Sequence, residues 1–169
     1  METYSETQRF RQWWVWLVLG LPAVLGWMGF VIQIILGREF GNQPAPDWVV
    51  ILIWVFGAFL LPLFMFRLSL ETRVVAREGI HLRFRPFRGR TVPFESIESV
   101  TPGTYRPIRE FGGWGVRWGG KGKRAYSVSG NERVEVILDD GTAWTIGTAR
   151  PDELAAAIRR ELTAGSRRG

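Results

Sequence analysis

The chain has 169 residues, among them one histidine and no cysteine. These counts exclude disulfides, thiol catalysis, cysteine-ligated metal centres and any metal site built from several histidines. The net charge is +6, and the excess lies late in the chain, because 19 basic and 12 acidic residues, a difference of +7, fall from Arg67 onward.

Residues 1–12 form a polar segment, which we predict to be an N-terminal tail on the cytoplasmic side of a membrane. The segment places Arg9 and Arg11 shortly before an apolar run. A cleaved signal peptide would have a basic start, a shorter apolar centre and a small-residue cleavage site. Glu2, Glu6 and the length of the apolar run argue against one, so this run is expected to stay as an anchor.

The segment 13–66 carries two apolar runs without a charged residue, 13–37 and 48–66, joined by a loop rich in glycine and proline. A helix crosses the hydrocarbon core of a bilayer with roughly 20 residues at about 1.5 Å rise per residue. Pro44 and Pro46 favour a turn between the runs. Residues 13–66 are therefore predicted to be a transmembrane helical hairpin, with tryptophans at both interfaces.

The arginines near the ends of the spans predict the orientation. Only Arg38 lies in the connecting loop, whereas two arginines precede the first span and three follow the second, at positions 67, 73 and 77. Because basic residues concentrate on the cytoplasmic side, both termini are expected in the cytoplasm. The chain is thus expected to be a multi-pass protein of the cell (inner) membrane.

Small residues recur at helical spacing in the first span, at Ala23, Gly26 and Gly29. Such residues let helices approach closely. Packing against the second span of the same hairpin is favoured over packing between two copies, and the oligomeric state stays open. Gln33 is the only strongly polar side chain in either span, and transporters normally place ionisable groups at membrane depth. Transport by this chain alone is therefore not expected.

From residue 67 the pattern changes to short strands, and 67–163 is predicted to be a cytoplasmic domain of an α+β membrane protein. About seven antiparallel strands are expected from alternating apolar residues and from turn signals, at 69–78, 80–87, 91–94, 96–100, 125–128, 133–138 and 142–148. Pro102 and Gly103 are expected to end the fourth strand. An amphipathic helix from Pro151 is predicted to cap an antiparallel barrel or sandwich, and residues 164–169 are expected to be a flexible tail.

Seven strands followed by a capping helix resemble the pleckstrin-homology (PH) fold. Several stretches look like those of bacterial membrane-anchored PH-like proteins: GIHLR at 79–83, FESIESV at 94–100, YRPIREFGGWGVRW at 105–118, AYSVSGN at 125–131 and the DDG turn leading to RPDELAAAI. Proteins of that kind typically have two transmembrane helices and one such domain, and most are of uncharacterised function. The resemblance implies a fold and a location more than an activity.

Basic residues form the candidate lipid- or partner-binding set. In many PH domains, phosphoinositide binding uses a basic residue in the first strand and a basic-x-Arg pair in the second, and three arginines here match that spacing loosely. Bacterial membranes generally lack those lipids, so the resemblance implies generic binding to an anionic surface at most. The alternative is a solvated strand face that blunts edge pairing. The set comprises Arg73, Arg83, Arg85, Arg88, Arg90, Lys121, Lys123 and Arg124.

The glycine- and tryptophan-rich stretch 105–131 invites several further interpretations. Gly115, Gly120 and Lys121 satisfy phosphate-loop spacing, but Gly122 stands where a serine or threonine must hold the metal, and no helix is predicted to follow. Nucleotide binding is therefore not expected. Trp114 and Trp118 could stack on a ligand, enter the membrane interface or complete a small core, and Tyr105, Arg106 and Arg109 could form a local polar network or a partner site. The candidate partner surface comprises Tyr105, Arg106, Arg109, Trp114, Arg117 and Trp118.

The sequence offers no carboxylate pair, Ser–His arrangement or metal cluster, so neither an enzyme nor a cofactor is expected. The leading hypothesis is a non-enzymatic protein that presents a basic PH-like domain at the cytoplasmic membrane surface, for anionic lipid headgroups or a membrane-protein partner. Nucleic acid is not expected, because tethering makes lipid the simpler partner of a basic domain. The alternative is a structural or accessory subunit of a larger membrane complex.

Overall fold

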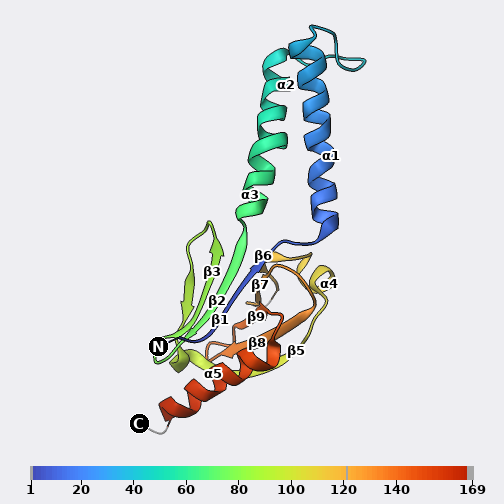
Figure 1. Cartoon of the computed structure of the whole chain (residues 1–169). Helices are drawn as coiled ribbons and strands as arrows, with labels where there is room; N and C mark the ends of the chain where they lie inside the picture. The colour runs from blue at the N-terminus through green and yellow to red at the C-terminus, as the bar shows by residue number, and fades with distance from the viewer. Residues whose placement is uncertain (1, 121, 167–169) are drawn as a thin grey trace. The chain divides into compact units, whose positions relative to one another are not determined.

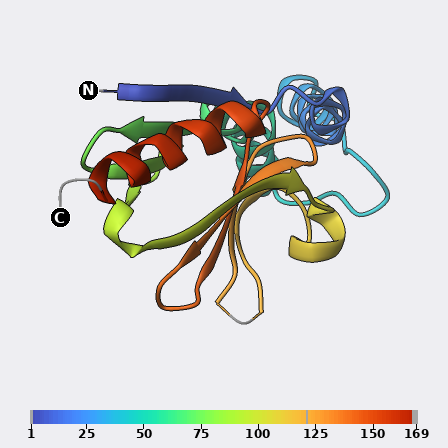
Figure 2. The same cartoon turned by 90° about the horizontal axis from the view of Figure 1, so that it is seen from below.

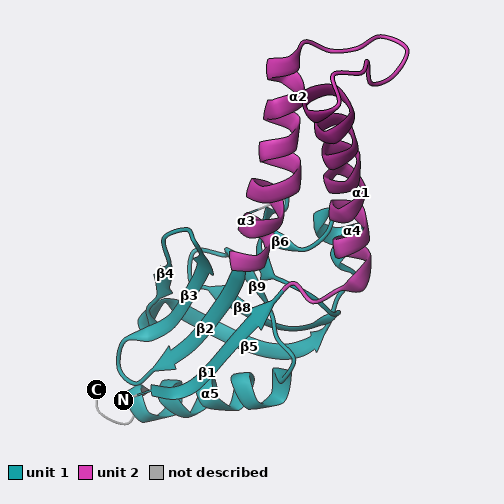
Figure 3. Cartoon of the chain, turned by 45° about the horizontal axis from the view of Figure 1, so that its top comes forward, with its two compact units in different colours: residues 1–9, 68–169 teal, residues 10–67 magenta. Residues whose placement is uncertain are grey.

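A computed structural model describes residues 2–120 and 122–166 of the chain. The chain divides into two compact units (Figure 3), one formed by residues 10–67 and the other by residues 1–9 together with 68–169. The second unit therefore takes segments from both sides of the first.

Residues 10–67 form two long apolar helices joined by a loop (Figure 1). By length and composition, Trp13–Ile35 and Asp47–Arg67 are each able to cross a membrane. Many of their large apolar side chains are exposed, with Trp13 at 73% and Phe66 at 65%, which is unusual for helices in water. The first helix comprises α1 (Trp13–Gly29) and the π-helical segment η1 (Phe30–Ile35), and the second comprises α2 (Asp47–Trp54), π-helical η2 (Val55–Leu60) and α3 (Leu61–Arg67).

Two of the three predicted small residues lie where the two halves of the hairpin approach. A Cβ atom on Gly26 would lie 3.4 Å from the Cα of Trp54, and one on Gly29 would lie 3.4 Å from the ring of Phe40. Both glycines are buried, whereas Ala23 is half-buried. These two positions thus serve packing within one hairpin, the use that the sequence favoured.

Gln33 ties the first helix to the end of the loop. Its Nε2 donates to the carbonyl of Ala45 at 2.6 Å and to Asp47 Oδ1 at 2.8 Å. The one strongly polar side chain of the first span therefore closes the hairpin.

The other unit contains a four-stranded antiparallel sheet in the order β1-β2-β3-β4. Along β2 and β3 every second side chain is buried in the core, including Leu70, Val74, Ile80 and Leu82. The side chains between them point to the opposite face, as a half-buried sheet requires. The strands are β1 (Glu2–Arg9), β2 (Ser69–Val75), β3 (Gly79–Arg85) and β4 (Arg90–Val92).

The prediction that residues 1–12 form an N-terminal tail was wrong, because most of them form strand β1. Residues Glu2–Arg9 pair antiparallel with β2, and Arg9 lies opposite Ser69. The two strands that precede and follow the apolar hairpin are therefore neighbours in one sheet. The pairing supplies the backbone partners that a polar segment cannot obtain by itself.

The five-stranded sheet has the order β5-β8-β9-β7-β6. Its one parallel pair, β7 with β9, departs from the predicted all-antiparallel arrangement. Strand β5 runs on to Thr104 instead of ending at Pro102, which lies opposite Val134. Proline is tolerated there because β5 is an edge strand. The strands are β5 (Ile97–Thr104), β6 (Gly115–Trp118), β7 (Arg124–Ser127), β8 (Glu132–Leu138) and β9 (Ala143–Gly147), with the short helices η3 (Phe94–Ser96) and α4 (Pro107–Phe111) between β4 and β6.

The terminal helix α5 (Pro151–Ser166) packs against strands of both sheets. Figure 2 shows it between β1 and β5, in agreement with its contacts. Leu154 and Ile158, on one face of the helix, are fully buried in the core. The amphipathic helix predicted from Pro151 is thus present, but it extends into the expected flexible tail as far as Ser166, and residues 167–169 lie outside the described part.

Candidate functional site

Three of the predicted arginines share the outward face of the four-stranded sheet. Side chains alternate along a strand, so Arg73 of β2 and Arg83 and Arg85 of β3 point away from the core. The strand register places Arg83 directly opposite Glu71 and Arg73 directly opposite His81. Pairing of β2 with β3 therefore gathers these five side chains on one surface.

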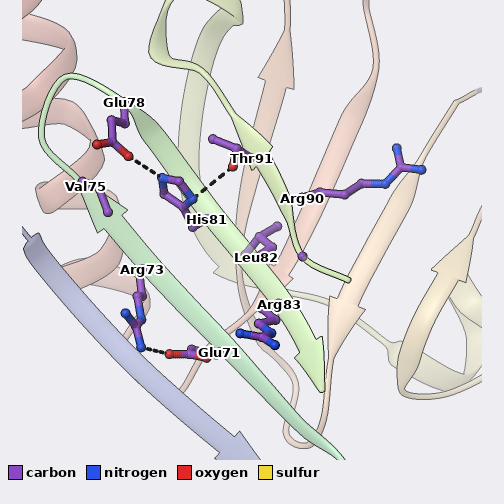
Figure 4. Close-up of a pocket in the computed structure, with 10 residues that line it drawn as sticks. Glu71, Arg73, Val75, Glu78, His81, Leu82, Arg83, Arg90 and Thr91 are labelled. Carbon is purple, nitrogen blue, oxygen red and sulfur yellow. Dashed lines mark hydrogen bonds and ion pairs between the residues drawn. The ribbon is translucent and has the colours of Figure 1, made fainter. Parts of the chain in front are cut away.

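Glu71 is a buried carboxylate held by two of these arginines. Its side chain is 8% exposed, against 45% and 52% for Arg73 and Arg85. Arg73 Nη2 donates to Oε1 (Figure 4), and Arg85 Nη2 donates to Oε2 at 3.1 Å. Burial alone would raise the pKa of Glu71, but the Arg73 hydrogen bond and the charges of both arginines outweigh it and lower the pKa. An ionised Glu71 thus anchors two guanidinium groups.

A hollow of about 430 Å³ lies on this face (Figure 4). His81 forms part of its wall, with Nε2 at 3.2 Å from Glu78 Oε2 and Nδ1 at 3.0 Å from Thr91 Oγ1. Three arginines and two glutamates line the hollow, so its cationic side chains outnumber its carboxylates. Its lining residues are Glu71, Arg73, Val75, Glu78, His81, Leu82, Arg83, Gly89, Arg90 and Thr91.

Arg83 is the cation of this face that carries no neutralising contact. Within residues 2–120 and 122–166, its guanidinium takes part in no hydrogen bond or ion pair, and its side chain lines the hollow. Arg90 also lines the hollow, but Figure 4 shows its side chain extending away from His81. Arg88 lies in the exposed turn between β3 and β4. Arg83 is therefore the residue best placed to meet an anion.

The other three predicted basic residues belong to the five-stranded sheet. Lys121 lies outside the described residues. Lys123 is exposed in the turn between β6 and β7, where Gly119 N donates to its carbonyl at 2.7 Å. The guanidinium of Arg124 lies 5.4 Å from the ring centroid of Trp144. The predicted basic set is thus divided between two sheets, although the charges of Arg90 in β4 and Arg124 in β7 both act on the phenol of Tyr126, whose pKa is raised by burial.

Tyr105 does not belong to an exposed partner surface, because it is only 4% exposed. Its ring contacts Phe111 edge-on at 6.2 Å between centroids, and the guanidinium of Arg133 lies 6.0 Å from its centroid. Burial raises the pKa of the Tyr105 phenol. This residue is therefore part of the core of the unit.

The remaining residues of the predicted partner surface differ in their environments. Trp114 Nε1 donates to the carbonyl of Gly130 at 2.9 Å, and Arg117 Nε donates to the carbonyl of Trp114 at 3.1 Å. The Trp114 bond fastens the start of β6 to the turn before β8, whereas the Arg117 bond is local. Trp118 is 73% exposed, and the other exposed members of the set are Arg106, Arg109 and Arg117.

A second buried carboxylate, Glu6 of β1, was not among the predicted sites. Its Oε1 accepts hydrogen bonds from Gln8 Nε2 and from the backbone N–H of Ala149, both at 3.0 Å. Its Oε2 accepts from Tyr4 at 2.6 Å and from Thr148 at 2.5 Å. Four uncharged donors therefore surround one carboxylate that is 9% exposed as a residue.

The Glu6 network joins β1 to the start of α5. Thr148 and Ala149 directly precede that helix, where a negative charge meets the favourable end of the helix dipole. The guanidinium of Arg150 lies 5.0 Å from the Tyr4 ring centroid. Burial, and next the hydrogen bond to Glu6, raise the pKa of Tyr4 to about 12. The alternation of Tyr4, Glu6 and Gln8 was the available sequence signal, but those residues show no apolar periodicity.

The outward face of β2 and β3 is rich in guanidinium groups. The part of the chain that the structure describes holds no group of three or more His, Cys, Asp or Glu side chains that could bind a metal ion. Arginines with half-exposed guanidinium groups suit phosphate and carboxylate oxygens. Comparison with family models, with curated proteins and with solved structures found no match. Fold and site together define an α+β chain with two helices able to cross a membrane and an arginine-rich sheet face.

Proposed function

We propose that the chain is an integral membrane protein whose hairpin spans the bilayer. The support is the exposed apolar surface of Trp13–Ile35 and Asp47–Arg67. Pairing of β1 with β2 adds a constraint, because the strands at the two ends of the hairpin must lie on the same side of the membrane. The excess of arginines outside the connecting loop favours the cytoplasmic side of the cell (inner) membrane.

We also propose that the non-membrane unit is PH-like. The described part of the unit has nine strands, of which β6 and β7 lie within residues 105–131, the segment that connects β5 to β8. Without that hairpin, seven strands and one terminal helix remain, which is the element count of the PH fold. In this arrangement the membrane hairpin is an insertion between the first and second strands of the domain, instead of an N-terminal extension.

The proposed function is non-enzymatic binding of anionic lipid headgroups by the outward face of β2 and β3. The observation that carries it is the group of three arginines around one buried carboxylate. Glu71 orders two of the guanidinium groups, and Glu2 adds a longer contact to Arg73 at 4.0 Å. Arg83 remains available beside the hollow. Basic residues near an anionic membrane surface contribute about 1 kcal/mol each, so a few arginines suffice for a tethered domain.

Native mass spectrometry of the full chain in mild detergent tests this function. The chain is extracted from membranes of mixed zwitterionic and anionic phospholipid, and the bound lipids are counted by headgroup. Arg83→Glu is expected to reduce retained anionic lipid severalfold. Arg109→Glu, which makes the same charge change at an exposed position on α4, is the matched control and is expected to retain lipid as the wild type does. Equal retention by the two variants would rule out headgroup binding at this face.

An accessory role in a larger membrane complex is the second candidate function. The observation that favours it is the exposure of two large apolar side chains in the segment between β5 and β8, Ile108 at 70% and Trp118 at 73%. Exposed apolar residues of this size are enriched where proteins associate. Crosslinking from position 118 in native membranes tests the idea, and a single stoichiometric protein adduct is expected. No protein adduct would exclude this surface as a subunit interface.

A further inference from the structure

The turn between β3 and β4 leaves the sheet at the end that is joined to the apolar hairpin. Arg9 of β1 lies opposite Ser69 of β2, and Ser69 lies opposite Arg85 of β3. These three residues form one row across the sheet. The apolar hairpin begins just after Arg9 and ends just before Ser69. The turn 86–89, which follows Arg85, therefore lies at the same end of the sheet as both connections to the hairpin.

Covalent geometry keeps this row close to the end of the second span. Arg67, the last residue of that span, is two residues before Ser69. Two residues of extended chain reach at most about 7 Å. If the span ends at the membrane interface, the turn that continues past Arg85 must lie within the interfacial region or next to it. This conclusion depends on chain connectivity and strand register alone.

The composition of the turn suits a lipid interface. Residues 85–91 read RPFRGRT, and every one of them is exposed. Phe87 is 54% exposed. Arginine beside an exposed aromatic ring can keep its charged end among headgroup phosphates while the ring and the methylene groups enter the apolar layer. Exposure of Phe87 and the positive charge next to it therefore have one common explanation.

The opposite end of the same sheet has a different composition. The turn between β2 and β3 reads Ala76, Arg77 and Glu78, with no aromatic residue. A seven-residue strand separates the two turns by roughly 20 Å. Glu95, which follows β4, is exposed near this second end, because Val92 pairs with Ile80. An exposed aromatic ring beside several arginines thus occurs at the end joined to the hairpin, whereas at the second end Phe94 is half-buried and Arg77 is followed by Glu78.

We propose that the turn 86–89 inserts Phe87 into the interface of the bilayer that holds the hairpin, with Arg85 and Arg88 at the lipid phosphates. The insertion gives the sheet a third attachment besides the two chain connections. It fixes the angle of the outward face to the membrane and so determines which lipids Arg83 can reach. The inference rests on the proposed membrane anchoring, but not on headgroup binding by Arg83.

Photocrosslinking of the full chain in native membranes tests the inference. The change Phe87→p-benzoyl-phenylalanine keeps an aromatic side chain at an exposed turn, and the photo-adducts are identified by mass spectrometry. The expected result is lipid adducts at position 87 and none with the same amino acid at Glu95. Circular dichroism of both variants checks that they fold. The same amino acid at Phe66, which is 65% exposed in the second span, gives the adduct yield expected inside a bilayer.

The outcomes separate this inference from the proposed function. Absence of lipid adducts at position 87 while position 66 reacts would overturn the insertion, as would a protein adduct at position 87 in place of lipid. Lipid adducts at position 87 together with unchanged lipid retention in Arg83→Glu would uphold the insertion and reject headgroup binding by the outward face. Absence of lipid adducts at position 66 would overturn membrane anchoring and the insertion with it.

Discussion

Two buried carboxylates on neighbouring strands, Glu6 of β1 and Glu71 of β2, are stabilised by opposite means. Glu6 faces the core and accepts hydrogen bonds from four uncharged donors. Glu71 faces outward and is held by two half-exposed arginines. The first arrangement fastens elements to one another, whereas the second orders cations on a surface. Similar burial therefore fastens core elements in one case and orders surface cations in the other.

The largest effect on stability is expected from Glu6→Ala. The change leaves the buried hydroxyls of Tyr4 and Thr148 without their carboxylate acceptor, and hydrogen bonds to a charged group contribute about 1.5–3 kcal/mol each. From these two bonds we expect a loss of about 3–5 kcal/mol in the free energy of unfolding. Denaturant unfolding of the full chain in detergent measures the loss, and hydrogen exchange should show the start of α5 opening first. A loss no greater than that of Glu71→Ala would contradict the comparison.

A smaller effect, about 1–1.5 kcal/mol at neutral pH, is expected from Tyr4→Phe, which removes one donor to Glu6. The pH dependence of stability identifies the Tyr4 phenol more specifically than the loss at neutral pH does. The pKa of Tyr4 is raised from 10.0 to about 12 in the folded protein. The folded state therefore holds the phenol proton more tightly, so this stabilisation is complete below pH 10 and is lost as the pH rises toward 12.

Unfolding measured between pH 9 and 12 tests the pH dependence. The wild type should lose stability across this range more steeply than Tyr4→Phe, and Tyr105→Phe serves as the comparison because its phenol pKa is also raised by burial. Parallel curves for the wild type and Tyr4→Phe would show that Tyr4 does not contribute.

The smallest effect is expected from Glu71→Gln, below about 1 kcal/mol at neutral pH, because both arginine partners stay half-hydrated. The pKa of Glu71 is lowered from 4.5. Its contribution is therefore present above pH 4.5 and is lost as the pH falls through the lowered pKa. The wild type should lose more stability than Glu71→Gln between pH 5 and 2. The variant should also release Arg73 and Arg85 from the order that Glu71 imposes, so it is expected to retain less anionic lipid, and unchanged or increased retention would contradict the assigned role.

Local sequence features predicted much of the fold and part of the site. The apolar runs and the proline-containing loop predicted the helical hairpin, and the alternation along β2 and β3 predicted which arginines point outward. The predicted site was less complete, because it lacked Glu71, the carboxylate that orders Arg73 and Arg85. It also included Tyr105, because an aromatic residue in a glycine-rich stretch carries no local sign of burial. Both depend on neighbours supplied by other strands.

The sequence by itself determined the hairpin, the β8–β9 turn at Asp140 and Gly141, and the start of the terminal helix at Pro151. Each follows from composition or periodicity within one short segment. Only the tertiary structure decided that the polar residues 2–9 form a strand, that Glu6 is buried and that β7 pairs parallel with β9. The physical reason is that these features depend on partners distant in the chain, since strand formation reflects the surface a segment packs against more than its own propensity. The turn at Phe87 combines both kinds of information, with its composition given by the sequence and its place beside the hairpin connections given by the pairing of β1, β2 and β3.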